Sequence, residues 1–93
     1  MPYHNDAKKR VRQNEKRKAR NRHYRSRMRT QIRKLRSLVE AGDHAGAVAQ
    51  LPITVSQIDR VAQKGIIHRK QAARRVSRLT NAVNSLKGEA ASA

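Results

Sequence analysis

The chain has 93 residues, enough for one domain but not for a second core. Its 23 Lys and Arg residues outnumber the 6 acidic residues, for a formal net charge of +17. This excess destabilises a compact state by self-repulsion unless a polyanion neutralises it. Nucleic acid is therefore the expected partner, and an anionic membrane surface is the rival.

Several residue types are missing, and their absence excludes whole classes of protein. Without cysteine there are no disulfides, thiolate metal sites or thiol nucleophiles. Tyr3 and Tyr24 are the only aromatic residues, too few for a module that stacks single-stranded bases on aromatic rings. The chain has neither an apolar run of 18 residues nor the apolar middle of a signal peptide. We therefore expect a cytoplasmic protein without a membrane partner.

A first helix is predicted over residues 7–40, with Asp6 or Asn5 as its N-cap and Gly42 at its end. Its apolar stripe is confined to the second half and consists of Tyr24, Met28, Ile32, Leu35 and Val39. Residues 8–23 have no such stripe, because at about 100° per residue their cations surround the helix with no gap wider than about 80°. These cations are Lys8, Lys9, Arg10, Arg12, Lys16, Arg17, Lys18, Arg20 and Arg22. This basic half cannot pack against protein, so it should project beyond the folded part.

A second helix is predicted over residues 43–64, with Asp43 as N-cap and Gly65 after its end. Its predicted apolar stripe is Val48, Leu51, Val55, Ile58 and Ala62. Pro52 costs a helix interior about 3 kcal/mol. The apolar period nevertheless passes through Pro52 in phase, so we predict a kink there and no break.

A third helix is predicted over residues 68–87, with the stripe Ala72, Val76, Leu79, Val83 and Leu86, followed by a frayed tail at 88–93. No single stripe can be buried alone, and the short connections favour antiparallel neighbours. The predicted fold is all-α: a three-helix bundle whose long basic N-terminal helix projects beyond the bundle.

Charge is distributed unevenly over these helices. Residues 8–36 hold fifteen basic side chains, ten of them Arg, and one acid, whereas residues 43–65 are neutral overall. Residues 68–87 hold six basic side chains and no acid, and Lys70, Arg74 and Arg78 form an i, i+4, i+8 row. Since the Arg fork grips phosphate with two hydrogen bonds, the first and third helices should face the polyanion.

Nothing in the sequence indicates catalysis, a cofactor or a small-molecule substrate. The histidines His4, His23, His44 and His68 have no zinc spacing, and no glycine-rich phosphate loop or nucleophile cluster is present. His68 precedes the third helix, where it can cap that helix or contact phosphate; the spacing leaves both open. We expect a non-enzymatic binding protein without metal.

Two rival basic-helix classes fit poorly. In a leucine-zipper DNA-binding protein the basic region is followed by several heptads, and here the heptad pattern stops at Gly42. A membrane-surface helix needs an apolar face opposite its charges, which residues 8–23 lack. A general nucleic-acid-binding protein, of nucleoid or basic-helix DNA-binding type, remains the alternative.

Three ordered blocks, taken together, resemble the bacterial small-subunit ribosomal protein S-twenty family over residues 7–87. They are Arg10-Val11-Arg12-Gln13-Asn14-Glu15-Lys16-Arg17 continuing to Arg20-Asn21-Arg22, then Ser26-Arg27-Met28-Arg29-Thr30 with Ile32, Lys34 and Arg36, and finally Lys64-Gly65-Ile66-Ile67-His68 with Ala72-Ala73-Arg74 and Ser77-Arg78-Leu79. The resemblance implies a ribosomal protein that acts as a monomer among other small-subunit components. It would bind the 5′ domain of the small-subunit ribosomal RNA and the lower end of the long 3′ minor-domain stem.

Carried onto this chain, the resemblance implies RNA contacts in two stretches. In the first helix they are Lys8, Lys9, Arg10, Arg12, Gln13, Asn14, Lys16, Arg17, Arg20, Asn21, Arg22, Arg25, Ser26, Arg27, Arg29, Thr30, Arg33 and Lys34. Around the third helix they are Lys64, Gly65, His68, Arg69, Lys70, Arg74, Arg75, Ser77 and Arg78.

Overall fold

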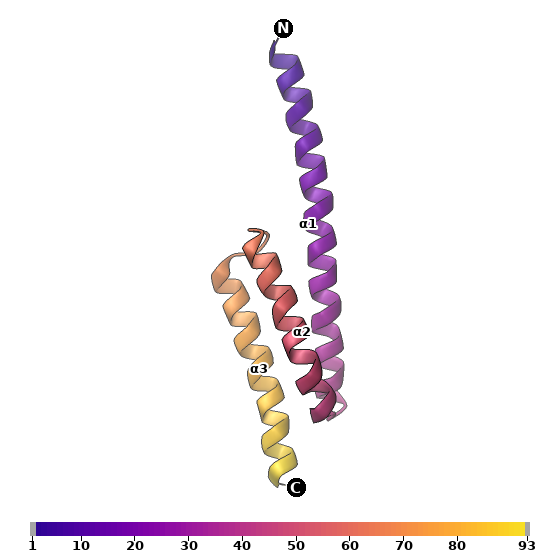
Figure 1. Ribbon diagram of the computed structural model, residues 1–93, viewed down its shortest axis with the longest axis vertical. Helices are drawn as coiled ribbons and strands as arrows, with labels where there is room; N and C mark the ends of the chain where they lie inside the picture. Colours follow the sequence, from indigo (N-terminus) through magenta and orange to yellow (C-terminus); the bar gives the residue numbers. More distant parts are fainter. Residues whose placement is uncertain (1, 93) are drawn as a thin grey trace.

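The computed structural model describes the backbone of residues 2–92 and the side chains of residues 7–86. Over this range the chain forms three helices and no strand: α1 (Pro2–Glu40), α2 (His44–Gln63) and α3 (Arg69–Ser92). The molecule is elongated, 73 × 21 × 15 Å, because the first half of α1 extends far past the turn between α2 and α3 (Figure 1). The prediction of an all-α three-helix bundle with a projecting basic helix is confirmed.

Glycine ends both α1 and α2. Gly42 (φ +72°) and Gly65 (φ +73°) have left-handed backbone conformations, which cost an L side chain about 1–2 kcal/mol. Both turns have the paired backbone hydrogen bonds of a Schellman motif. The bonds run from Gly42 N to Val39 O (3.1 Å) and Asp43 N to Leu38 O (2.9 Å), and from Gly65 N to Ala62 O (2.9 Å) and Ile66 N to Val61 O (3.2 Å).

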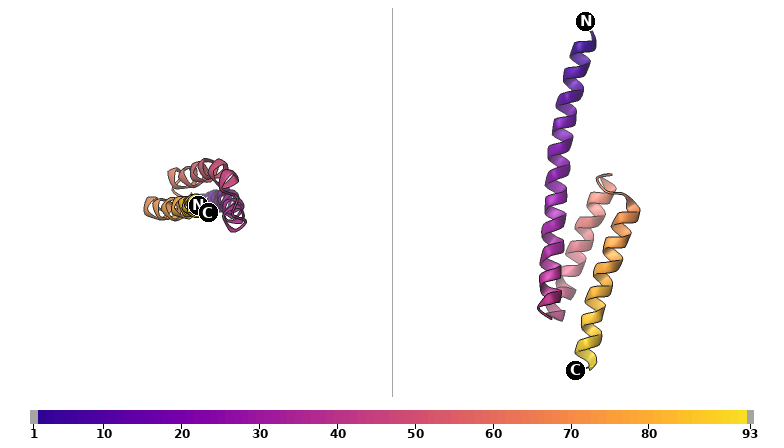
Figure 2. Two further views of the ribbon diagram at one scale, coloured as in Figure 1. Left: turned by 90° about the horizontal axis from the view of Figure 1, so that it is seen from below. Right: turned by 180° about the vertical axis from the view of Figure 1, so that it is seen from behind.

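The core lies among the three helices, which form the corners of a triangle when seen from below (Figure 2). Its buried apolar side chains are Met28, Ile32 and Leu35 from α1, Ala47, Ile58 and Val61 from α2, Ile66 from the turn, and Ala72, Leu79 and Val83 from α3. α2 packs extensively against both other helices, whereas α1 and α3 contact each other much less. The neutral helix therefore provides most of the contact that joins two cationic ones.

The predicted apolar stripes of α1 and α3 coincide with the buried faces. The stripe predicted for α2 is correct at Ile58, which is fully buried, and at Leu51 and Ala62, which pack against the core, but it is one residue out of phase at Val48 and Val55. Its fully buried positions are Ala47, Thr54, Ile58 and Val61, while Val48 is 48 % exposed. Two stripes that start one residue apart, at Ala47 and at Val48, have the same helical period, so periodicity alone does not distinguish them. The stripe that starts at Val48 places Val55 in the core, whereas the structure buries the polar Thr54 there.

Thr54 is buried because its hydroxyl is satisfied inside the bundle. The hydroxyl accepts from Gln50 Nε2 (3.3 Å) and lies within donating distance of the Gln50 carbonyl (3.1 Å) and the Gln31 carbonyl of α1 (3.3 Å). Gln50 Nε2 also donates to Gln31 Oε1 at 2.6 Å. A buried hydroxyl with partners avoids the cost of an unmade hydrogen bond, so the α1–α2 interface contains a small polar network.

The ends of the helices also differ from prediction. α1 begins at Pro2, so neither Asn5 nor Asp6 is its N-cap; proline suits a first helical position because the N–H that it lacks would have no helical partner. α3 extends to Ser92, beyond its predicted end at residue 87, since Gly88 costs a helix only about 1 kcal/mol and Glu and Ala favour one. Fraying of residues 88–93 stays a prediction. Ala93 lies outside the described residues.

Asp43 is the N-cap of α2, as predicted, and its Oδ1 accepts a hydrogen bond from Gly46 N at 2.9 Å. The absent side chain of Gly46 leaves the space that the Asp43 carboxylate and Leu38 occupy. α2 is continuous through Pro52, which lies on the exposed side of the helix. The carbonyl that loses its helical partner there can bond water instead, which lowers the cost of the proline.

The phase of α2 can be tested with two neighbouring substitutions. Ala47→Leu should lower the free energy of unfolding by about 1–3 kcal/mol, because it overpacks a fully buried position. Val48→Leu, the matched control at a half-exposed position, should change it by less than about 0.5 kcal/mol. Urea unfolding followed by circular dichroism measures both; equal effects would contradict the observed register.

Candidate nucleic-acid interface

The basic half of α1 is solvent-exposed on every side. All described side chains from Ala7 to Arg20 are exposed, Asn21 is the first that is partly buried, and Tyr24 is the first to pack against the core. We call residues 7–20 the arm. Its cations contact no other helix of the bundle, so they are available to an external polyanion at every azimuth.

The arm leaves the bundle at a junction between α1 and the turn after α2. Lys64 Nζ lies 4.8 Å from the centroid of the Tyr24 ring, a cation–π contact. Next to it, Arg25 Nη2 donates to the carbonyl of Ile66 at 3.3 Å. Arg25 and Lys64, both expected to contact RNA, therefore also hold the turn between α2 and α3 against α1.

Two other predicted site residues have structural roles of their own. Gly65 provides the left-handed residue that ends α2. His68 caps α3: its Nδ1 accepts from Lys70 N at 3.1 Å, and its carbonyl accepts from Ala72 N at 3.1 Å. Of the two roles that the sequence left open for His68, the structure shows capping. While Nδ1 accepts this hydrogen bond, Nε2 is the ring nitrogen that remains for a ligand.

Further down α1, the predicted site residues lie on two sides of the helix. A shallow hollow on one side is lined by Lys18, Asn21, Arg22, Arg25, Ser26 and Arg29. A second hollow, beside Gln50 of α2, is lined by Thr30, Arg33 and Lys34 together with Ser37 and Leu38. Asn21 Oδ1 is buried in the first hollow and has no hydrogen-bond partner within the described part of the chain.

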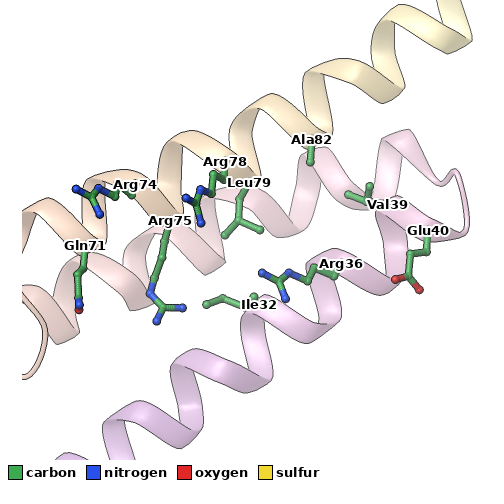
Figure 3. A pocket seen from close by; sticks show the side chains of 10 residues that line it. All are labelled: Ile32, Arg36, Val39, Glu40, Gln71, Arg74, Arg75, Arg78, Leu79 and Ala82. Carbon is green, nitrogen blue, oxygen red and sulfur yellow. The ribbon is translucent and has the colours of Figure 1, made fainter.

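The cationic face of α3 borders a groove of about 470 Å³ between α1 and α3 (Figure 3). Its lining residues are Ile32, Arg36, Val39 and Glu40 from α1, and Gln71, Arg74, Arg75, Arg78, Leu79 and Ala82 from α3. Three predicted site residues of α3, Arg74, Arg75 and Arg78, thus line the same groove as Arg36 of α1. Arg36 and Gln71 were not among the predicted contacts, because only the packing of α3 beside α1 places them at a common groove.

Two negative findings apply to the described residues. None of the helices there is long and apolar enough to cross a membrane. No group of three or more His, Cys, Asp or Glu residues is placed to hold a metal ion.

Comparison with known proteins identifies the family. The family model described as "Ribosomal protein S20" matches residues 2–84. The chain belongs to the ribosomal protein S20 family. It is 50% identical over 86 residues to the small ribosomal subunit protein bS20 of Trichlorobacter lovleyi, which covers 92% of this chain and 99% of that protein. The protein of the same name from Hydrogenobaculum is 46% identical over 84 residues, 90% of each chain.

Membership of the S20 family confirms the family resemblance seen in the three sequence blocks. It also confirms the expected role of a structural ribosomal protein without enzymatic activity. The general nucleic-acid-binding alternative is no longer needed to explain the charge, because a ribosomal RNA-binding role accounts for it.

The junction contacts predict a difference between two arginines of α1. Arg25→Ala should lower the free energy of unfolding by about 1 kcal/mol, because it removes a hydrogen bond that joins α1 to the turn after α2. Arg17→Ala, in the exposed arm, should change it by less than about 0.5 kcal/mol. Urea unfolding measures both; loss of stability in the Arg17 variant would show that the arm packs on the bundle.

Proposed function

We propose that this S20-family protein braces small-subunit ribosomal RNA by neutralising phosphates where RNA segments crowd together, as a single copy within the ribosome of the bacterial cytoplasm. The observation that carries the proposal is the arm, whose cations point in every direction and contact no other helix. A helix of this kind lowers its self-repulsion only when polyanion surrounds it or lies on several of its sides.

The proposed contacts fall into three groups. The arm provides Lys8, Lys9, Arg10, Arg12, Gln13, Asn14, Lys16, Arg17 and Arg20, all exposed. The middle of α1 provides Asn21, Arg22, Arg25, Ser26, Arg27, Arg29, Thr30, Arg33 and Lys34, and the third helix with its preceding turn provides Lys64, His68, Arg69, Lys70, Arg74, Arg75, Ser77 and Arg78. Gly65 contributes the turn conformation that places Lys64 and His68.

The shape supports an RNA ligand with two separate parts. The arm and the bundle lie at different positions along a molecule 73 Å long (Figure 1). Both carry exposed cations. We propose that one protein spans the 5′ domain and the lower end of the long 3′ minor-domain stem in this way. Binding involves no turnover: phosphate contacts release counterions and hold the RNA segments at a set separation.

The first test compares two nucleic acids. With about 6–10 phosphate contacts, affinity for a small-subunit 5′-domain RNA fragment should fall roughly 10³–10⁵-fold between 50 and 200 mM salt. At physiological salt this fragment should bind clearly better than duplex DNA of equal length. A flat salt profile would contradict the phosphate contacts, and equal binding of RNA and DNA would contradict the ribosomal RNA preference.

The second test concerns the order of the arm. Because the arm has no protein partner, its helix in the free protein should depend on local propensity alone, and it should order fully on binding RNA. In hydrogen exchange, backbone amides of residues 8–20 should exchange rapidly in the free protein and slowly in the complex. Amides of residues 28–35, in the core-packed part of α1, are the internal control and should be protected in both states. Strong arm protection without RNA would refute the proposal.

A further inference from the structure

The groove between α1 and α3 combines apolar side chains with several arginines, a composition typical of a ligand site. Its floor is apolar, formed by Ile32 of α1 and Leu79 of α3, and Arg36, Arg75 and Arg78 stand above it. In Figure 3, the guanidinium groups of Arg36 and Arg75 extend from opposite helices toward the same space over Ile32, and that of Arg78 lies close by. Two helices that contact each other little thus present convergent donors.

Convergent arginines repel one another unless an anion lies between them. Among the described residues that line the groove, Glu40 is the one acid, and it lies at the opposite end of the groove from Arg75 (Figure 3). An anionic ligand held by two or three guanidinium groups would relieve this repulsion and gain charge-assisted hydrogen bonds.

We propose that this groove binds one unpaired nucleotide of the small-subunit ribosomal RNA. Its phosphate lies between Arg36 and Arg75, and its base stacks on a guanidinium plane above the floor formed by Ile32 and Leu79. Gln71, at the end of the groove, offers an amide to the base edge or to a 2′-hydroxyl. This inference rests on the proposed function, since the nucleotide belongs to the RNA that the arm binds.

Size and composition favour a nucleotide over a duplex or an acidic peptide. The groove is lined by side chains of two adjacent helices, and a double helix is too wide to enter it. An apolar floor below planar cations suits a base, because unstacked RNA bases stack on arginine planes as well as on aromatic rings. Continuity supports the same ligand, since Arg74 and Arg78 of the groove belong to the exposed cationic row of α3.

The test compares single charge removals inside and outside the groove, in the full chain. Arg36→Gln and Arg75→Gln should each weaken binding of the 5′-domain RNA fragment about tenfold or more. Arg60→Gln is the matched control: it removes the same charge from α2, on a surface hollow lined by α2 residues alone. Thermal unfolding of the free protein checks folding, and the two groove variants should melt no lower than wild type because they relieve repulsion.

A second readout locates the contact on the RNA. Chemical acylation of ribose 2′-hydroxyls should show at least one unpaired nucleotide that wild type and Arg60→Gln protect and that both groove variants leave reactive. The inference is overturned if the groove variants keep every protection and lose no more affinity than Arg60→Gln, or if the protection that they lose lies in a duplex. If wild type itself shows no preference for the RNA over duplex DNA, the proposed function fails instead.

Discussion

Repulsion between two cationic helices is the constraint on which the rest of this structure depends. α1 and α3 carry nearly all the excess charge, and a core that includes ten buried apolar side chains among residues 7–86 has to hold them together. The structure meets this constraint by packing the neutral α2 against both of them, while α1 and α3 touch only over a short stretch. Where they do approach, the arginines line an open groove and are not buried, because an unpaired buried cation is far more costly than an exposed one.

The same constraint explains why α1 changes character at Tyr24. On the C-terminal side of Tyr24, one stripe of the helix is apolar and the bundle covers it. On the N-terminal side, cations surround the helix and no protein surface can cover them. The junction made by Arg25, Lys64 and the Ile66 carbonyl lies at this boundary. It ties the turn between α2 and α3 to the point where the arm begins, so the bundle sets the direction in which the arm points.

Several residues that carry the family resemblance serve the fold as well as the interface. Gly65 ends α2, His68 caps α3, and Lys64 lies over the ring of Tyr24. The block from Lys64 to His68 is therefore recognisable in the sequence partly because a tight turn requires it. Motif matching alone cannot separate these roles, since it records which residue is present and not which atoms that residue contacts.

Much of this protein could be predicted from its sequence. Helical periodicity and glycine punctuation predicted three helices in a bundle, and the all-round distribution of cations over residues 8–23 predicted the projecting arm, because both are properties of one helix considered alone. What depended on neighbouring helices could not be predicted. The burial of Thr54 required the carbonyl of Gln31 from α1, and this shifted the packed face of α2 from Val48 to Ala47. Arg36 and Arg75 line one groove only because α3 packs beside α1. Local sequence determines where each helix lies along the chain and which of its faces are polar. Contacts between residues distant in the chain exist only after the helices have packed.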